Sequence, residues 1–410
     1  MLVKLDSYYS PAISTLPFIH TILRSADERE DNSLDGGFYV YNLFELTRLY
    51  ENWQRQLPNV KLYYAVKCNS DEQLLIHLAE LGACFDCASP AEIDLVLKHT
   101  RVHPSKILYA NPQKSHIDIR SAIERGVSQT TFDSVYELDK IASIIGDHPQ
   151  QMKCLLRFYA NDPTAQCPLS HKFGALPDEW PALLQRAREL GLSVIGMSFH
   201  VGSGAKSPAA FQQAIQDAHK LYNLGLTFGY TLSILDIGGG FTQGTFDAFA
   251  ETIRHTLQSS ASFPFTLIAE PGRYFTETVA TLMTKVSGRR DRGDERHYYI
   301  TDSIYGSFNA MMYDHLVPRP IPYITAQKEF EQNHPSYSST SSPPSSPELK
   351  FSSTLFGATC DGLDTIVSNV LLPELQVGDW IMWPNMGAYT IAGASLFNGF
   401  GFPFIPKFYM

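Results

Sequence analysis

Lys67 is the residue whose surroundings most strongly suggest chemistry in this sequence. It follows the apolar run 62–66, and a helix signal comes directly after it, because Ser70 and Gln73 have capping-box spacing and Gly82 ends the apolar helix face. Lys67 is therefore predicted at the carboxyl end of a buried strand, where α/β folds place their reactive groups. A solvated lysine at a strand end would give the same local pattern, so the other polar residues must decide.

Short apolar runs alternate with helical patterns through the first two thirds of the chain. The runs lie near 61–66, 83–87, 106–110, 129–133, 153–158, 193–199, 233–237 and 265–270. Capping boxes at 89–92 and 134–137 begin two of the intervening helices. Eight such units over about 220 residues predict an α/β fold, a TIM-like (β/α)₈ barrel. The competing open sheet should carry G-x-G-x-x-G after its first strand, and this motif is missing there.

Each of these runs ends in a polar residue or in glycine. The residues are Lys67, Asp86, Asn111, Asp133, Arg157, His200, the glycines at 238–240, and Glu270 with Arg273. Because the carboxyl ends of barrel strands form one mouth, these side chains are expected to lie together.

The seventh and eighth runs are followed by groups suited to binding an anion. Gly238, Gly239 and Gly240 allow backbone N–H groups to approach an anion, and Arg273 adds a guanidinium. Ser203 can add a hydroxyl. Loops after strands seven and eight are the usual phosphate site of barrels. A tight turn alone would explain the glycines but not Arg273.

A phosphate site beside a lysine, a carboxylate and a histidine suits pyridoxal 5'-phosphate. Lys67 would hold the aldehyde as a Schiff base, and Glu270 would keep the ring nitrogen protonated. His200 would stack on the ring, although taken alone it is better explained as a core histidine. A Schiff-base aldolase for sugar phosphates needs the same lysine and phosphate site but does not explain Glu270.

Composition narrows the class of protein. The chain has 410 residues, of which 44% are hydrophobic, and this composition is typical of a globular protein. The net charge of −10 argues against nucleic-acid binding. No apolar run is long enough to span a membrane. Six scattered cysteines fit reduced thiols in the cytoplasm. One C-x-x-C pair at 84–87 without a second pair does not favour a metal site.

The pattern changes after residue 276, where short strands and turns replace the alternation. We therefore expect a barrel domain at 38–276 and an all-β second domain at 277–410, completed by residues 1–37. Residues 334–348 are rich in serine and proline and are expected to form a mobile loop without chemistry.

The motifs closely resemble those of the eukaryotic ornithine decarboxylases, group IV decarboxylases of the alanine-racemase-like fold type III class of pyridoxal-phosphate enzymes. The resemblance runs from about residue 38 to the C-terminus. In the barrel it is carried by YAVKCN at 64–69, FDCAS at 85–89, SFHVGSG at 198–204, DIGGGF at 236–241 and EPGRY at 270–274. In the second domain it is carried by YGSFN at 305–309, YDH at 313–315, CDGLD at 360–364 and NMGAY at 385–389.

The resemblance implies roles for individual residues. The implied phosphate ligands are Ser203, Gly240, Arg273 and Tyr389, while Asp86, Arg157 and His200 surround the ring and Lys67. Asp314 and Asp361, with Tyr313 nearby, are implied to receive the distal ammonium of the substrate. Cys360 is implied to return a proton to Cα, and Phe397 to line the pocket that receives the substrate carboxylate.

The implied activity is decarboxylation of L-ornithine to putrescine, a step of polyamine synthesis. The implied active unit is a homodimer in which Cys360 and Asp361 reach the neighbouring subunit. Lysine differs from ornithine by one methylene, worth roughly 1–3 kcal/mol, so lysine or another basic amino acid stays open as substrate. Diaminopimelate decarboxylases carry glutamate where this chain has Asp361. A catalytically dead regulatory paralogue should have lost Lys67, Cys360 or a phosphate ligand, and none is lost; whether a regulatory protein binds stays open.

Overall fold

The computed structural model describes residues 10–160, 162–258, 265–334 and 349–410. The chain forms two compact units, one built from Met1–Leu46 with Thr276–Met410 and the other from Thr47–Phe275. In the described part of the chain, no helix is both long enough and apolar enough to cross a bilayer.

The unit Thr47–Phe275 is a closed barrel of eight parallel strands, which confirms the predicted fold class. Its strands are β2 (Val60–Ala65), β3 (Cys84–Cys87), β4 (Ile107–Tyr109), β5 (Gln129–Phe132), β6 (Lys153–Arg157), β7 (Ser193–Ser198), β8 (Ile234–Asp236) and β9 (Thr266–Ala269). Pairing of β2 with β9, from Val60↔Leu267 to Leu62↔Ala269, closes the ring.

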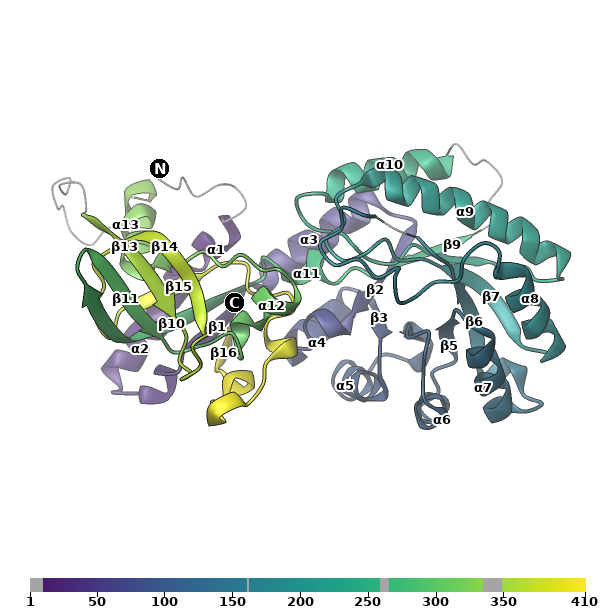
Figure 1. Cartoon of the computed structure of the whole chain (residues 1–410), viewed down its shortest axis with the longest axis horizontal. Coiled ribbons are helices and arrows are strands. Elements are labelled where there is room, and N and C mark those ends of the chain that lie inside the picture. Colours follow the sequence, from purple (N-terminus) through teal and green to yellow (C-terminus); the bar gives the residue numbers. More distant parts are fainter. Residues whose placement is uncertain (1–9, 161, 259–264, 335–348) are drawn as a thin grey trace. The chain divides into compact units, whose positions relative to one another are not determined.

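Helices surround the barrel (Figure 1). They are α3 (Leu43–Gln56), α4 (Glu72–Glu80), α5 (Pro90–Thr100), α6 (His116–Glu124), α7 (Val135–Ile145), α8 (Trp180–Glu189), α9 (Pro208–Thr227), α10 (Phe246–Gln258) and α11 (Arg273–Thr276). Inside the barrel, Tyr63, Leu108, Leu155 and Ile268 pack into one buried cluster. Because three of them come from the non-adjacent strands β2, β4 and β6, they meet across the barrel interior.

The helix starts differ from the predicted capping boxes in detail. Helix α4 is capped by Asp71, not by Ser70: the Asp71 carboxylate accepts the backbone N–H groups of Gln73 and Leu74, each at 3.1 Å. Asn69 favours this choice because its side chain accepts the Asp71 N–H at 3.0 Å. A carboxylate at this position also interacts favourably with the helix dipole.

The predicted capping box at 134–137 is only half formed. Ser134 accepts the N–H of Glu137 at 3.3 Å, but the Glu137 side chain does not return to the Ser134 backbone. It is instead fully buried and pairs with Lys114 at 2.8 Å and Lys140 at 2.7 Å. A buried carboxylate pairs with a buried ammonium because neither charge is tolerated alone in the interior.

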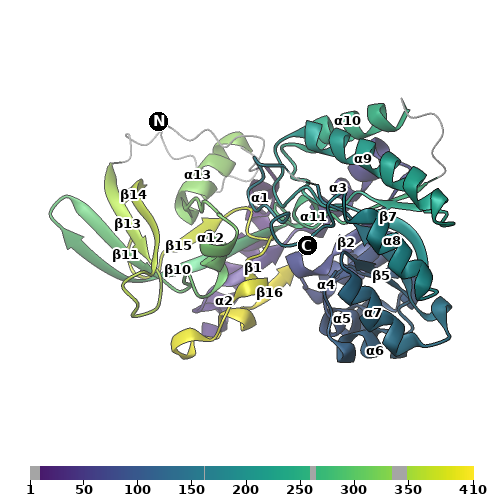
Figure 2. The same cartoon turned by 45° about the vertical axis from the view of Figure 1, so that its right-hand side comes forward.

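The second unit is organised around a mixed sheet in the order β12-β15-β10-β11-β13-β14; β1 also pairs with β10, and β16 pairs with β1. Figure 2 shows β10, β11, β13 and β14 side by side. The strands are β1 (Phe38–Tyr41), β10 (Ala280–Arg292), β11 (Glu295–Ile300), β12 (Ile321–Pro322), β13 (Lys350–Phe356), β14 (Thr365–Pro373), β15 (Trp380–Trp383) and β16 (Lys407–Tyr409).

Strand β1 corrects the domain boundary expected at residue 38. It pairs antiparallel with β10 and parallel with β16, so it belongs to the sheet and not to the barrel unit. All four of its residues are buried, which suits a strand flanked by partners on both edges. The barrel closes on β2 to β9 without it.

The second unit also contains helices, where the sequence pattern predicted only strands. They are α1 (Ser10–Ser14), α2 (Leu16–Glu28), α12 (Ala310–Tyr313) and α13 (Tyr323–Asn333). Apolar residues of α2, among them Ile19 and Ile22, pack against Phe38, Val40 and Met283 of the sheet. The loop expected at 334–348 lies outside the described residues, except for His334 at the end of α13.

Candidate active site

Lys67 lies at the mouth of the barrel, in the short helix η3 (Val66–Cys68) that follows β2. It is half-buried and forms an ion pair with Asp86, which is completely buried. The two meet because β2 and β3 are paired with Ala65 opposite Asp86. The second carboxylate oxygen of Asp86 accepts no hydrogen bond from the described residues.

Glu270 and Asp236 form a buried pair of carboxyl groups at the ends of β9 and β8. Asp236 Oδ1 accepts the Gly238 N–H at 2.9 Å, and Glu270 donates its own N–H to Gly238 O at 2.7 Å. Asp236 Oδ2 and Glu270 Oε1 receive no donor from the described part of the chain. The two carboxyl groups interact with each other, and this interaction favours a proton on Glu270 and a negative charge on Asp236.

Burial raises the pKa of Asp236 to about 7. Burial, followed by the nearby charges of Asp236 and Asp86, raises the pKa of Glu270 well above its usual value. Asp236 was not among the residues predicted for the site from the sequence. The signal was present, because Asp236 is a polar residue at the end of an apolar run, two residues before the triple glycine.

This pair of carboxyl groups predicts a pH effect on the stability of the cofactor-free protein. The pKa values of Asp236 and Glu270 are higher in the folded protein than in the unfolded protein. Their contribution to stability is therefore complete at a pH below the unfolded-state pKa, and it is lost as the pH rises through the folded-state pKa. Between about pH 5 and about pH 8, wild type should therefore lose on the order of 2 kcal/mol more stability than Asp236→Asn. Urea unfolding at the two pH values measures this, and equal losses would contradict it.

His200 follows β7, and its pKa is lowered well below the usual 6.5, first by burial and then by the positive charges of Arg157 and Lys67. The ring is therefore neutral. Its Nδ1 accepts the Gly202 N–H at 3.0 Å, which leaves the proton on Nε2. Arg157 itself ends β6, and its guanidinium lies 5.2 Å from the centre of the Phe173 ring.

Ser203 and Arg273 meet beside the triple glycine. Arg273, buried at the start of α11, donates from Nη2 to Ser203 Oγ at 3.1 Å. Gly240 has a φ of +104°, and a Cβ there would come within 2.6 Å of Gly202 O. A Cβ on Gly238 would come within 2.2 Å of Phe199 O. Glycine is thus required at both positions for the loops after β7 and β8 to pack on each other.

These residues fit pyridoxal 5'-phosphate. A buried guanidinium with an adjacent hydroxyl suits the phosphate. The Glu270 carboxyl, with its raised pKa and an oxygen that receives no donor from the described residues, suits a ring nitrogen that must carry a proton. Lys67 provides a primary amine for the aldehyde. All of these groups belong to the unit Thr47–Phe275.

The other unit brings together three residues predicted to face the substrate: Cys360, Asp361 and Phe397. The Tyr305 hydroxyl donates to Asp361 Oδ2, and the Tyr305 ring stacks on Phe397 with 4.0 Å between centroids. Cys360 is exposed, and its Sγ lies 3.4 Å from Asn398 Oδ1. Tyr305 and Asn398 were not assigned roles from the sequence, although Tyr305 begins a quoted motif and Asn398 adjoins Phe397.

Asp314, Tyr313 and Tyr389 belong to this same unit. Asp314 is buried at the end of α12, and Tyr313 is 78% exposed. Tyr389 is half-buried and adopts a left-handed φ of +59°, which is unusual for a bulky side chain. Their roles toward cofactor and substrate stay predictions.

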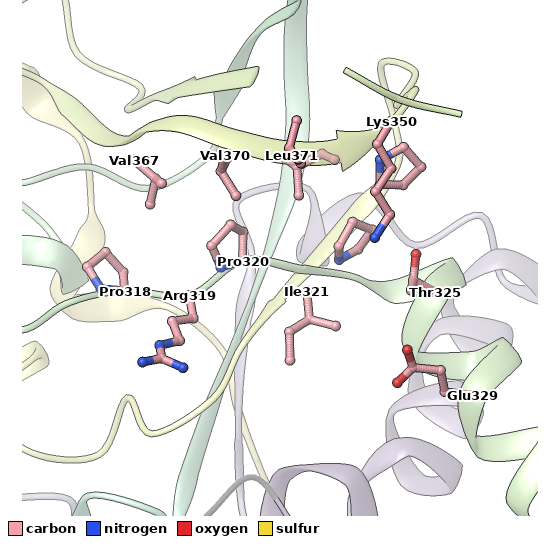
Figure 3. Close-up of a pocket in the computed structure, with 13 residues that line it drawn as sticks. Pro318, Arg319, Pro320, Ile321, Thr325, Glu329, Lys350, Val367, Val370 and Leu371 are labelled. Atoms are coloured by element: carbon pink, nitrogen blue, oxygen red, sulfur yellow. The ribbon is translucent and has the colours of Figure 1, made fainter. Parts of the chain in front are cut away.

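A separate apolar cavity of about 350 Å³ lies in the second unit, between β12, α13 and β14. Figure 3 shows Val367, Val370 and Leu371 of β14 opposite Pro318 and Pro320. None of the residues predicted for cofactor or substrate lines this cavity.

Comparison with known proteins agrees with this geometry. The family model described as "Pyridoxal-dependent decarboxylase, pyridoxal binding domain" matches residues 43–277. An ornithine decarboxylase of Caenorhabditis elegans is 39% identical over 97% of this chain and 92% of its own length. The structure of Paramecium bursaria Chlorella virus arginine decarboxylase is 35% identical, with a TM-score of 0.86 over 96% of this chain and 100% of that one.

A lysine/ornithine decarboxylase from Vibrio vulnificus, solved with putrescine, is 28% identical with a TM-score of 0.80, over 95% of this chain and 97% of that one. The chain belongs to the pyridoxal-dependent decarboxylases. It is an amino-acid decarboxylase whose cofactor is pyridoxal 5'-phosphate. The resemblance to the eukaryotic ornithine decarboxylases stated from the sequence is thereby confirmed.

Proposed function

We propose that this protein converts L-ornithine to putrescine and carbon dioxide, as a step of polyamine synthesis. The observation that carries the proposal is the barrel mouth, where Lys67, Glu270 and the Ser203–Arg273 pair lie in one unit. The name shared by several curated relatives at about 40% identity supports ornithine as the substrate.

When bound, the cofactor supplies a conjugated ring that accepts the electron pair released as carbon dioxide leaves. Lys67 would hold it at the aldehyde, and Arg273 with Ser203 would hold the phosphate. Glu270 would keep a proton at the ring nitrogen, because its raised pKa favours a protonated carboxyl that can give its proton to a basic partner. Neutral His200 offers a flat ring to pack on without adding a charge.

The second unit carries groups suited to a diamino acid. Asp361 is oriented by the Tyr305 hydroxyl and Asp314 is buried, so the two carboxylates suit a distal ammonium. The Cys360 thiol is held by the Asn398 side-chain oxygen and would return the proton to Cα. Phe397, stacked on Tyr305, gives an apolar wall for the substrate carboxylate.

Carbon dioxide release from ornithine, lysine, arginine and diaminopimelate tests the proposal. Ornithine should give the highest kcat/KM. Asp361→Ala should lower kcat/KM for ornithine by about 100-fold, because an ammonium loses a charged partner worth roughly 1.5–3 kcal/mol. Faster turnover of arginine or lysine would reassign the substrate. No release from any of the four by cofactor-loaded protein would favour a catalytically dead regulatory paralogue.

We further propose that the active unit is a homodimer with shared sites, supported by the exposure of Cys360. Lys67→Ala and Cys360→Ala should each be nearly inactive alone. When equal amounts of the two variants exchange subunits, half of the dimers contain one subunit of each kind. Each mixed dimer has one intact site of two, so activity should return to about a quarter of wild type. Activity that stays at the level of the separate variants would contradict a shared site.

We also propose a cytoplasmic location. The support is that the six cysteines, all of which lie in the described part of the chain, form no disulfide, which suits a reducing compartment. Fractionation of cells producing the native chain tests this, and enrichment in an organelle fraction would contradict it.

A further inference from the structure

Residues 162–167 carry no predicted cofactor ligand, yet they form a wall behind the loop that contains Ser203. Cys167 and Ser203 exchange two backbone hydrogen bonds, each of 3.0 Å. On the same wall Gln166 donates to Gly204 O at 3.1 Å, and Asp162 donates to Val201 O at 3.1 Å. Backbone hydrogen bonds from the segment after β6 therefore hold Ser203 itself and residues on both sides of it.

The opposite side of the Ser203 loop rests on the triple glycine. Ala205 donates its N–H to Gly240 O at 3.1 Å, and Gly202 approaches Gly240 so closely that no Cβ fits. The loop is thus packed between the segment 162–167 and the triple glycine. Arg273, from a third segment, donates to the Ser203 hydroxyl. The position of Ser203 Oγ depends on all three.

The Asp162 side chain links the segment 162–167 to the residues that follow the Ser203 loop. Its side chain is completely buried, and each carboxylate oxygen accepts two hydrogen bonds. Oδ1 accepts the N–H of Thr164 at 2.8 Å and its hydroxyl at 2.6 Å. Oδ2 accepts the N–H groups of Lys206 at 2.8 Å and Ser207 at 2.9 Å. One carboxylate therefore ties the start of the wall to the end of the Ser203 loop.

This carboxylate is fully charged. Burial alone would raise the pKa of Asp162, but the hydrogen bonds from Thr164, Ser207 and Lys206 outweigh burial and hold that pKa below its usual 3.8.

We infer that Asp162 is a positioning residue for the cofactor phosphate, acting through the Ser203 loop without touching the cofactor. The inference rests on the proposed phosphate site and adds a specific consequence. Lys67, Asp86 and Glu270 lie on other strand ends, so loss of Asp162 should weaken only the phosphate contribution to binding. Without the carboxylate, the N–H groups of Lys206 and Ser207 lose their acceptor, and the loop must be ordered when the phosphate binds.

The test compares pyridoxal 5'-phosphate with pyridoxal, which lacks the phosphate, on the full chain freed of cofactor. Asp162→Asn should raise the Kd for pyridoxal 5'-phosphate by about tenfold, because an amide cannot accept all four hydrogen bonds. The Kd for pyridoxal should stay unchanged. Asp118→Asn is the matched control: it removes a carboxylate that accepts a backbone hydrogen bond at the start of α6 in the same barrel, and it should leave both values unchanged.

Equal weakening of both ligands, or weakening of neither, would overturn the inference. Should Asp162→Asn fold poorly, Thr164→Val removes one donor and should shift only the phosphate-bearing ligand, by about two- to threefold. Ser203→Ala tests the phosphate site separately from the positioning role of Asp162. If Ser203→Ala weakens pyridoxal 5'-phosphate binding and Asp162→Asn does not, only the positioning role fails; if neither does, the phosphate site itself is wrongly assigned.

Discussion

Lys67→Ala should lower kcat for decarboxylation by at least about 10³-fold and abolish the absorption band of the Schiff base between lysine and cofactor. The substitution removes the amine that holds the cofactor aldehyde. Lys114, another buried lysine of the barrel, cannot replace it. Its Nζ is engaged by Glu137 and by two backbone carbonyls, of Asn111 at 2.7 Å and Thr131 at 2.9 Å.

Lys67→Arg is the matched control for charge. Arginine keeps a cation beside buried Asp86 but has no primary amine, so it should be as inactive as Lys67→Ala. Stopped assays with purified, cofactor-supplemented protein and absorption spectra measure both effects. A Schiff-base band that persists in Lys67→Ala, or activity that persists in Lys67→Arg, would contradict the assignment of this lysine.

Glu270→Gln should reduce kcat by about 10²–10⁴-fold while leaving the fold intact. Glutamine fills the same space and can still donate to Asp236, but it cannot supply a carboxylate to keep the ring nitrogen protonated. The raised pKa of Glu270 shows how strongly burial and the neighbouring carboxylates disfavour its charge until a cationic partner is present. Steady-state kinetics with saturating cofactor measures the loss.

Glu270→Asp provides the comparison, because it keeps the acid and shortens the side chain by one methylene. It should retain more activity than Glu270→Gln. A Glu270→Gln enzyme with an unchanged kcat would exclude the proposed role at the ring nitrogen, even if cofactor affinity fell.

The sequence predicts the barrel well because its strands are short apolar runs that end in polar residues or in glycine. Lys67, Glu270 and Arg273 were found in this way, and chain topology alone brings them to one mouth. The start of α4 is predicted one residue early because Ser70 and Asp71 are both good capping residues. The choice depends on the Asn69 side chain, whose direction the sequence does not show.

Other features depend on contacts between distant segments. The run 38–41 fits either unit by its pattern, and its partners β10 and β16 lie more than two hundred residues further along the chain. Asp236 gains its importance only from a buried neighbour on β9. Tyr305 and Asn398 matter because folding places them against Asp361 and Cys360.

The pairing of β1 also affects how the chain folds during translation. The four residues of β1 leave the ribosome before the whole barrel, whereas the sheet strands that cover them are synthesised after it. The barrel segment can close as a unit while β1 is still without its partners. Until β10 emerges, the nascent chain therefore displays an apolar stretch, Phe38–Tyr41, of the kind that chaperones bind.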